Sequence, residues 1–151
     1  MANVAFASNK LTDLMLESYF LYNAESGTAA VFKLMLLGSS FTPSKTHQFI
    51  SDVVAHEVTG AGYTAGGKTV TITVGDPNNT LNETRAQCAG TSWPNSTVLV
   101  KAAVLYKVKA GNSTHQIVGS IVYDTVLVSA GTELFIGAFE FPLKNLGTLP
   151  A

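Results

Sequence analysis

The chain has 151 residues, which is enough for one domain with a substantial core and too few for two domains of ordinary size. The chain has nine Lys and Arg residues and ten Asp and Glu residues, so its positive and negative charges nearly balance. This balance gives no basic surface that would favour nucleic acid or an anionic membrane as a partner. Charged residues make up only 13% of the chain and hydrophobic residues 46%, which predicts that part of the surface is uncharged and covered by other subunits.

The cysteine content and the first residues indicate the cellular setting. Cys88 is the single cysteine, so it can form neither an internal disulfide nor a cysteine-rich zinc site. The opening sequence MANVAFASNK lacks the long apolar stretch of a signal peptide. We therefore expect a protein that is made inside the cell.

The N-terminal part is predicted to contain an arm followed by one helix. Residues 1–10 show no periodicity and are expected to be an arm that becomes ordered on a neighbour, while 11–151 form a single β-sandwich domain. Apolar side chains recur at helical spacing between 11 and 22, which predicts one amphipathic helix that covers a sheet. These side chains are Leu11, Leu14, Met15, Tyr19 and Tyr22.

Strands follow, separated by turns. The predicted strands are 28–37, 68–74, 84–89, 97–108, 116–129 with a possible break at Asp124, and 133–141. Turn signals stand at 75–78, 93–95, 110–112 and 130–131. Segment 68–74 alternates between apolar and threonine residues, as in a sheet with one buried face. The second face of 97–108 carries Leu99, Ala103 and Leu105 beside two lysines, as in a strand that is covered on only part of that face.

A second short helical segment is predicted near 46–58, where Phe49, Ile50, Val53 and Val54 recur at three and four residues and Thr46 stands at a capping position. The predicted fold class is therefore mainly β, an antiparallel β-sandwich or jelly roll with one N-terminal helix and this short helical segment.

The histidines and carboxylates of this segment do not have metal-ligand spacing. His47 and His56 are nine positions apart, and the sequence after His56 and Glu57 has Gly60 where a zinc protease needs its second histidine. We interpret these side chains, with Asp52, as capping and surface groups. No metal is predicted.

The glycines between Gly60 and Gly67 are spaced unlike a dinucleotide-binding loop and follow a predicted helix instead of a strand. Their predicted role is backbone freedom at a turn, where a positive φ or a close approach to a strand is needed. No cofactor is predicted.

No catalytic site is predicted either. Three histidines and no G-x-S-x-G turn leave no activated nucleophile, and Cys88 is interpreted as a small buried hydrophobic residue. Ten acidic residues always contain some pair that folding brings together, but their sequence context gives no support for sugar hydrolysis. Trp93, before Pro94, is either a packed staple at the end of the sandwich or an exposed ligand platform, and we favour the staple.

The segment 32–71 carries the most specific pattern of the chain. It reads FKLMLLGSSFTPSKTHQFISDVVAHEVTGAGYTAGGKTVT, with the short motifs LLGSSFTP, THQFISDV and GAGYTAGG in that order. This pattern resembles a family of small structural proteins of tailed bacteriophages, with Phe41 where the family has tyrosine. The resemblance continues more weakly through 91–93, 102–106 and 119–124.

The resemblance implies a non-enzymatic virion protein. Chain size, strand content and low charge narrow the expectation to a capsid decoration (cement) protein on the outer head surface, which binds the major capsid protein and itself, as a dimer or trimer, after synthesis in the host cytoplasm. The alternatives are a tail or neck protein and, in another class, a carbohydrate-binding host-attachment module. The terminal segments are expected to bind neighbours, through the apolar residues Val4, Phe6, Phe141, Leu143, Leu146 and Leu149.

Overall fold

The computed structural model describes residues 15, 17, 19–23, 28–109 and 115–144. The chain divides into two compact units. Residues 31–71 and 90–137 form what we call the four-stranded unit, and residues 1–30, 72–89 and 138–151 form what we call the three-stranded unit. Each unit is described by itself. The arm at 1–10 and the single domain at 11–151 stay predictions.

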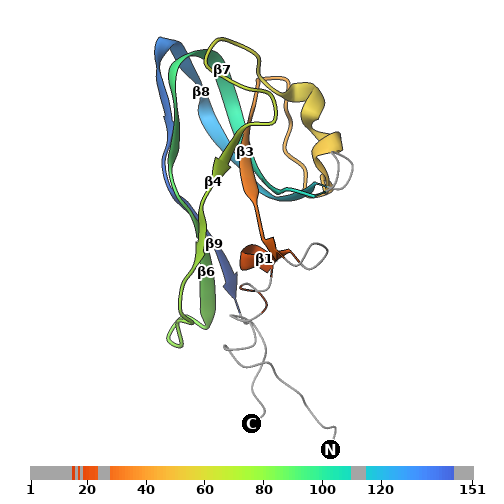
Figure 1. Cartoon of the computed structure of the whole chain (residues 1–151), viewed down its shortest axis with the longest axis vertical. Helices are drawn as coiled ribbons and strands as arrows, with labels where there is room; N and C mark the ends of the chain where they lie inside the picture. Colours follow the sequence, from red (N-terminus) through yellow and green to blue (C-terminus); the bar gives the residue numbers. More distant parts are fainter. Residues whose placement is uncertain (1–14, 16, 18, 24–27, 110–114, 145–151) are drawn as a thin grey trace, which may run out of the picture. The chain divides into compact units, whose positions relative to one another are not determined.

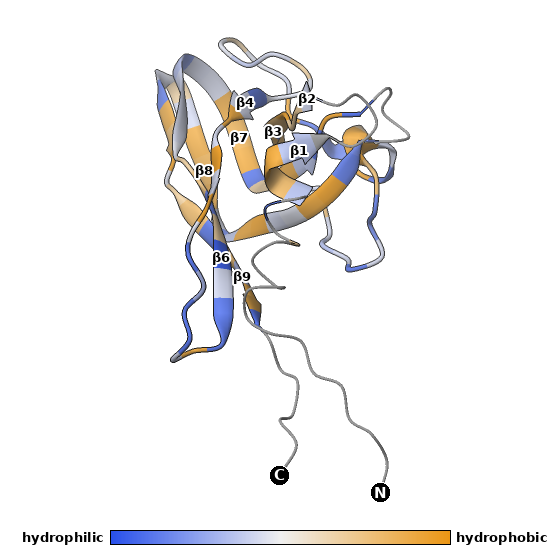
Figure 2. Cartoon of the chain, turned by 60° about the horizontal axis from the view of Figure 1, so that its bottom comes forward, coloured by the Kyte–Doolittle hydropathy of each residue, from blue (hydrophilic) through white to orange (hydrophobic). Residues whose placement is uncertain are grey.

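The four-stranded unit is built on an antiparallel sheet in the order β4-β3-β7-β8 (Figure 1). Its strands are β4 (Lys68–Val70), β3 (Phe32–Leu37), β7 (Thr91–Lys107) and β8 (Gln116–Ile136). Figure 2 shows hydrophobic residues along part of β7. β3 is apolar except at Lys33, and the second half of β7 is rich in valine, alanine and leucine, which explains why these two strands form the buried centre of the sheet.

Both faces of the sheet are buried where β3 and β7 pair. On one face a cluster forms with side chains from the segment after β3, and it consists of Met35, Leu37, Phe41, Ile50, Val53, Ala102, Val104 and Tyr106. On the other face Ala103, Leu105 and Lys107 are buried, whereas Leu99 is exposed. The prediction that β7 is covered on only part of its second face is confirmed.

The segment 46–58 is helical, but it forms two short 3-10 helices, η1 (Ile50–Asp52) and η2 (Val54–His56). Thr46 does not cap them, because its hydroxyl lies 2.7 Å from the Ser44 hydroxyl. Asp52 supplies the cap instead, since its Oδ2 accepts hydrogen bonds from the backbone N–H groups of Gln48 and Phe49 at 2.9 and 3.0 Å. These bonds lower the pKa of Asp52, with the bond from Phe49 as the largest cause.

Two predicted turns are bulges inside long strands. Residues 93–95 lie within β7, and 130–131 lie within β8, where Gly131 has φ +70°. The pairing register shifts at both places, between Trp93 and Ser96 and between Ser96 and Thr97 of β7. A glycine at positive φ is typical of a bulge, which inserts an extra residue and lets the strand continue. The predicted turns at 93–95 and 130–131 were therefore wrong.

The predicted break at Asp124 is a larger irregularity. Val100 pairs with Leu127 and Ala102 pairs with Val122, so β8 advances five residues while β7 advances two. Lys101 binds the extra residues, because its Nζ donates hydrogen bonds to the carbonyl oxygens of Tyr123 and Asp124 at 2.5 and 3.0 Å. The predicted break was therefore wrong, because β8 continues through Asp124 and only its pairing is irregular there.

The three-stranded unit contains an antiparallel sheet in the order β5-β6-β9. Its strands are β5 (Ile72–Val74), β6 (Glu83–Cys88) and β9 (Phe139–Lys144). The predicted strand 68–74 was wrong as one element, because β4 and β5 belong to different sheets and the chain leaves the first sheet at Thr71. Its predicted alternation of burial is confirmed: Val70, Ile72 and Val74 are less exposed than the threonines between them.

Other boundaries also differ from the prediction. The strand 28–37 is split into β2 (Thr28–Ala29) and β3, and β2 pairs with β1 (Tyr22–Asn23). The strand 133–141 is divided between β8 and β9. The predicted turn at 110–112 lies outside the described residues.

The N-terminal helix is present at the described positions Met15, Glu17 and Tyr19 to Leu21. Tyr22 does not extend it, because this residue starts β1. The predicted apolar face was partly wrong: Met15 is 60% exposed, whereas Phe20 is buried with its ring edge-on to Tyr19. Phe20, which the predicted face did not include, is therefore the buried residue among the described positions of this helix.

The predicted fold class is confirmed, since the chain is mainly β, its sheets are antiparallel and its helical content is small. Within the described residues, no helix has the length and apolar character that crossing a membrane requires.

Candidate functional site

Exposed apolar side chains lie on the outer part of β7 and β8. Leu99 and Val128 are cross-strand partners, and they are 60% and 65% exposed. Their sequence neighbours Val98 and Ser129 are buried, so the exposed pair points away from the buried face. Val126, two residues before Val128, is also exposed. We call Leu99, Val126 and Val128 the Leu99–Val128 patch.

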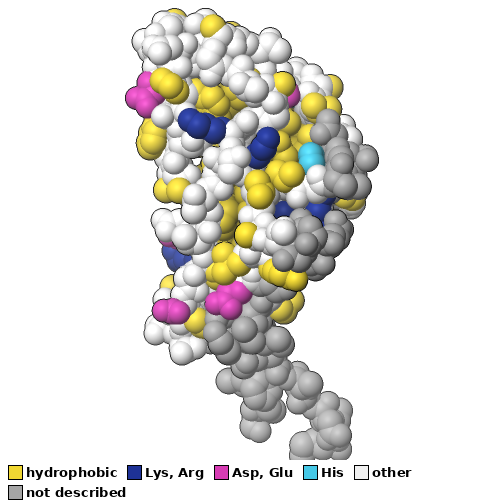
Figure 3. Space-filling view, viewed as in Figure 1, with side chains coloured by type: hydrophobic (Ala, Val, Ile, Leu, Met, Phe, Trp, Pro, Cys, Tyr) yellow, Lys and Arg dark blue, Asp and Glu magenta, His cyan; other side chains and the backbone are white. Residues whose placement is uncertain are grey.

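An open groove of about 700 Å³ runs beside this patch. One wall consists of residues 38–40 and 55–59, and the other consists of residues 97–99 and 128–130. Figure 3 shows apolar side chains spread over the visible face with few charged groups among them. Exposed apolar side chains next to a groove are typical of a protein interaction surface.

The glycine-rich loop 60–67 follows one wall of this groove in the sequence and packs closely against the backbone of neighbouring strands. A Cβ at Gly60 would lie 2.0 Å from the carbonyl oxygen of Thr97, and a Cβ at Gly67 would lie 2.0 Å from that of Leu34. Gly67 also has φ +80°. Thr97 in turn donates a backbone hydrogen bond to Ala61 O at 2.9 Å. The predicted role of these glycines, close approach to strands with positive φ, is confirmed.

Glu57 organises the same loop with its carboxylate. Its Oε1 accepts hydrogen bonds from the Tyr63 hydroxyl at 2.7 Å and from the Gly66 N–H at 2.6 Å. The Tyr63 hydroxyl also accepts a bond from Leu36 N, and the Tyr106 hydroxyl donates to Gly66 O. We call Glu57, Tyr63, Gly66 and Tyr106 the Glu57 cluster. This cluster ties the loop to β3 and β7. Glu57 therefore has a structural role, because its carboxylate accepts two hydrogen bonds within the protein.

Burial raises the pKa values of both tyrosines in the Glu57 cluster. For Tyr63 the pKa lies far above its usual range, because the ring is desolvated and its hydroxyl donates to Glu57. For Tyr106, desolvation and the nearby Glu57 raise the pKa to about 12. Both hydroxyls are therefore neutral hydrogen-bond donors at physiological pH.

Trp93 is a packed side chain. It is only 4% exposed, and its ring centroid lies 6.2 Å from that of Tyr63. The exposed-platform alternative was wrong, because the ring is buried, and a staple at the end of the sandwich stays a prediction.

The three histidines form separate local contacts. The Nδ1 of His56 lies 2.8 Å from the Ser40 hydroxyl, and the Nδ1 of His115 accepts a bond from Lys109 N at 2.7 Å. Desolvation, with a contribution from Lys33, lowers the pKa of His115. In the part of the chain that the structure describes, no group of three or more His, Cys, Asp or Glu side chains is placed to hold a metal ion.

The contact between Ser40 and His56 was not foreseen from the sequence, because the two residues are sixteen positions apart and only the fold brings them together. A serine next to a histidine is one part of a nucleophilic site, which also needs an acid to orient the histidine. Among the described residues, no carboxylate is hydrogen-bonded to the other ring nitrogen of His56. Cys88 is buried, and desolvation raises its pKa to about 11.

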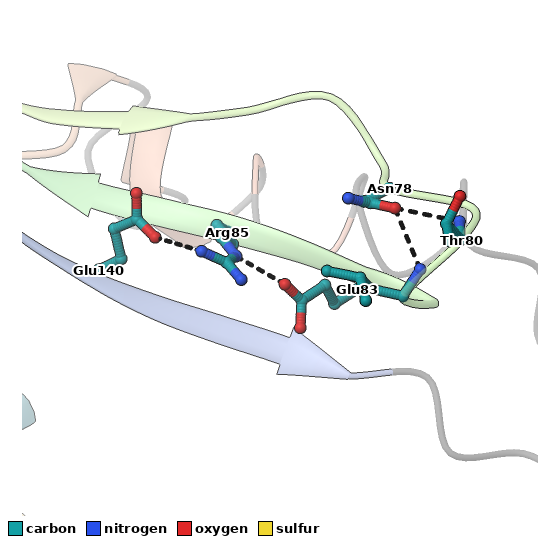
Figure 4. A network of polar contacts seen from close by, with 6 residues as sticks. Asn78, Thr80, Glu83, Arg85 and Glu140 are labelled. Atoms are coloured by element: carbon teal, nitrogen blue, oxygen red, sulfur yellow. Dashed lines mark hydrogen bonds and ion pairs between the residues drawn. The ribbon is translucent and has the colours of Figure 1, made fainter.

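A polar network occupies the three-stranded unit (Figure 4). Arg85 on β6 donates from Nε to Glu83 at 2.6 Å and from a terminal nitrogen to Glu140 on β9 at 2.7 Å. The Oδ1 of Asn78 accepts bonds from the backbone of Thr80 and Leu81, each at 3.0 Å, and so fixes the turn before β6. Arg85 therefore links the two glutamates through two ion pairs.

The predicted interface residues have different outcomes. Val4, Phe6, Leu146 and Leu149 lie outside the described residues. Phe141 is half-buried in β9 beside Phe139, with the two rings edge-on at 5.4 Å, and Leu143 is 39% exposed. Their role at an interface stays a prediction. Leu99 was predicted to lie on the second face of its strand, but the patch could not be predicted, because Val128 pairs with Leu99 only in the folded sheet.

Comparison with protein-family models, curated proteins and solved structures finds no match to this chain.

Proposed function

We propose that this protein is a bacteriophage capsid decoration, or cement, protein that binds the assembled head shell as a homo-oligomer. The observation that carries the proposal furthest is the exposed Leu99–Val128 patch beside a groove on the four-stranded unit. The resemblance of segment 32–71 to phage structural proteins supplies the virion context. Few charges and exposed apolar side chains are typical of a chain that binds the surface of another protein.

The proposed mechanism is adhesive. The Glu57 cluster and the glycine loop hold one wall of the groove rigid against β3 and β7, so a partner would meet a preformed surface. Each contact with the shell is weak, but many copies on one lattice act together. A protein that binds the finished lattice and not its unfolded subunits stabilises the lattice by mass action.

The test uses particles that lack this protein. We expect them to assemble but to lose resistance to heat and to chelation, and to regain it when purified protein is added back. The Val128→Asp variant should restore little resistance, because it places a charge in the patch. Thr69→Asp, at an exposed position of β4, introduces the same charge elsewhere and should restore it fully. If deletion stops head formation, or yields full heads without tails, the protein belongs to the shell lattice or the neck.

Truncation separates the patch from the terminal segments. If the terminal segments carry the attachment, a chain without residues 1–10 and 145–151, which keeps β9 whole, will stay folded and bind shells poorly, while Val128→Asp will bind normally. The carbohydrate-binding alternative gains no support from Trp93, whose ring is buried.

A further inference from the structure

The four-stranded unit contains a second cavity, separate from the groove beside the Leu99–Val128 patch. Its lining points to a binding activity that the proposed function does not include. It measures about 470 Å³, which is within the range of small-molecule sites. It lies between the loop after β3 and the strands β7 and β8. Its lining consists of Phe41, Pro43, Ser44, Lys45, His47, Val53, Val104, Ile117, Val118, Gly119 and Ser120.

The floor of this cavity is apolar. Val53 and Val104 are buried members of the hydrophobic cluster, and the partly exposed Ile117 packs against that cluster. The cavity therefore lies directly over the core of the unit, and Ile117 and Val118 give it accessible apolar surface on which an apolar group gains free energy by leaving water.

The entrance is polar and cationic. Ser44, Lys45 and Ser120 are exposed, and His47 lies with its ring centroid 5.8 Å from that of Phe41. None of the lining residues is Asp or Glu. Asp52 interacts electrostatically with His47, but it does not line the cavity and its carboxylate accepts backbone hydrogen bonds from Gln48 and Phe49. Lys45 thus gives the entrance a positive charge without an acidic lining residue.

The two sides of the cavity are tied together by backbone hydrogen bonds. Ile50 N donates to His115 O at 3.0 Å, and Ile117 N donates to Gln48 O at 2.8 Å. These bonds join the start of η1 to the start of β8. The cavity is therefore preformed, which lowers the entropy cost of binding.

We propose that this cavity binds a small amphipathic anion, with its apolar body against the accessible side chains of Ile117 and Val118 and its single carboxylate at Lys45. An apolar floor and a cationic entrance favour this class over a neutral or cationic ligand of the same size.

The test is a titration of the folded full-length protein followed by the methyl NMR signals of Ile117 and Val118. Octanoate, octanol and octylammonium are the probes, because they share an apolar chain and differ in charge. Octanoate should shift these signals at the lowest concentration and octylammonium at the highest. Absence of octanoate binding, equal affinity for the three probes, or shifts confined to Val128 and Leu99 would overturn the proposal.

Three variants complete the test. Lys45→Glu should weaken octanoate binding about tenfold, because it replaces an attraction by a repulsion, and should strengthen octylammonium binding. Lys144→Glu makes the same charge change at an exposed position of β9 and should change neither affinity. Ser120→Trp, which fills the entrance from an exposed position, should abolish binding of all three probes without lowering the melting temperature. Equal effects of Lys45→Glu and Lys144→Glu, or unaltered binding by Ser120→Trp, would contradict the assignment.

Discussion

A glycine is needed either because its φ is positive or because a side chain would collide with neighbouring atoms. Two glycines of this chain allow these two reasons to be tested separately. Gly67 and Gly131 both have positive φ, at +80° and +70°. A Cβ at Gly67 would collide with the backbone of Leu34, whereas a Cβ at Gly131 would meet no atom within 4 Å. The two positions therefore form a matched pair for substitution.

Gly131→Ala should lower the free energy of unfolding by about 1–2 kcal/mol, the cost of a left-handed conformation for an L-residue. Gly67→Ala should lower it by more than about 4 kcal/mol, because β3 or the loop must also move apart. Urea unfolding followed by fluorescence measures both values. Equal losses in the two variants would show that the contact with Leu34 does not matter.

Cys88 should resist alkylation in the native protein. Its side chain is buried and desolvation raises its pKa to about 11, so at pH 8 the thiol is both inaccessible and protonated. Iodoacetamide should therefore react at the rate at which the protein opens, and reaction should become fast in urea. Rapid alkylation in native buffer would contradict the burial of this residue.

Among the elements, the loop 57–67 depends on one carboxylate. Glu57→Ala removes the acceptor of the Tyr63 and Gly66 hydrogen bonds, so we expect a loss of about 2 kcal/mol in the free energy of unfolding. Glu57→Gln keeps one acceptor oxygen and should lose clearly less. Thermal unfolding of both variants is the measurement, and the same stability for Ala and Gln would mean that these bonds do not hold the loop.

The strand-forming segments and the glycine turn were predictable because their signals are local, whereas the points at which one strand ends and the next begins were not. Alternation around Val70 and Ile72, and the mixed second face of β7, follow directly from the order of the residues. The bulges at 93–95 and 130–131 were not predictable, because Pro94 and Gly131 signal a turn equally well, and only pairing with the neighbouring strand lets the chain continue.

The candidate sites were much less predictable than the fold. The Leu99–Val128 patch depends on the register between two strands, and the cavity combines Lys45 with Val104 and Ser120, which are far apart in sequence. The close spacing of Glu57 and Tyr63 was visible, but it gave no sign that their side chains bond to each other.

At the scale of the whole molecule, the low charge content and the exposed patch predict self-association. Sedimentation at micromolar concentration and moderate salt should show a species larger than the 15.9 kDa monomer. Val128→Asp should shift the protein toward the monomer and Thr69→Asp should not. A monomer that is unchanged on concentration would count against a homo-oligomer.

The number of copies of this chain in purified phage particles tests the central claim most directly. A decoration protein repeats over the capsid lattice, so quantitative mass spectrometry calibrated on the major capsid protein should find on the order of hundreds of copies per particle. About a dozen copies or fewer would contradict the claim and place the protein at the neck, and copies in multiples of three or six spread along the tail would make it a tube protein.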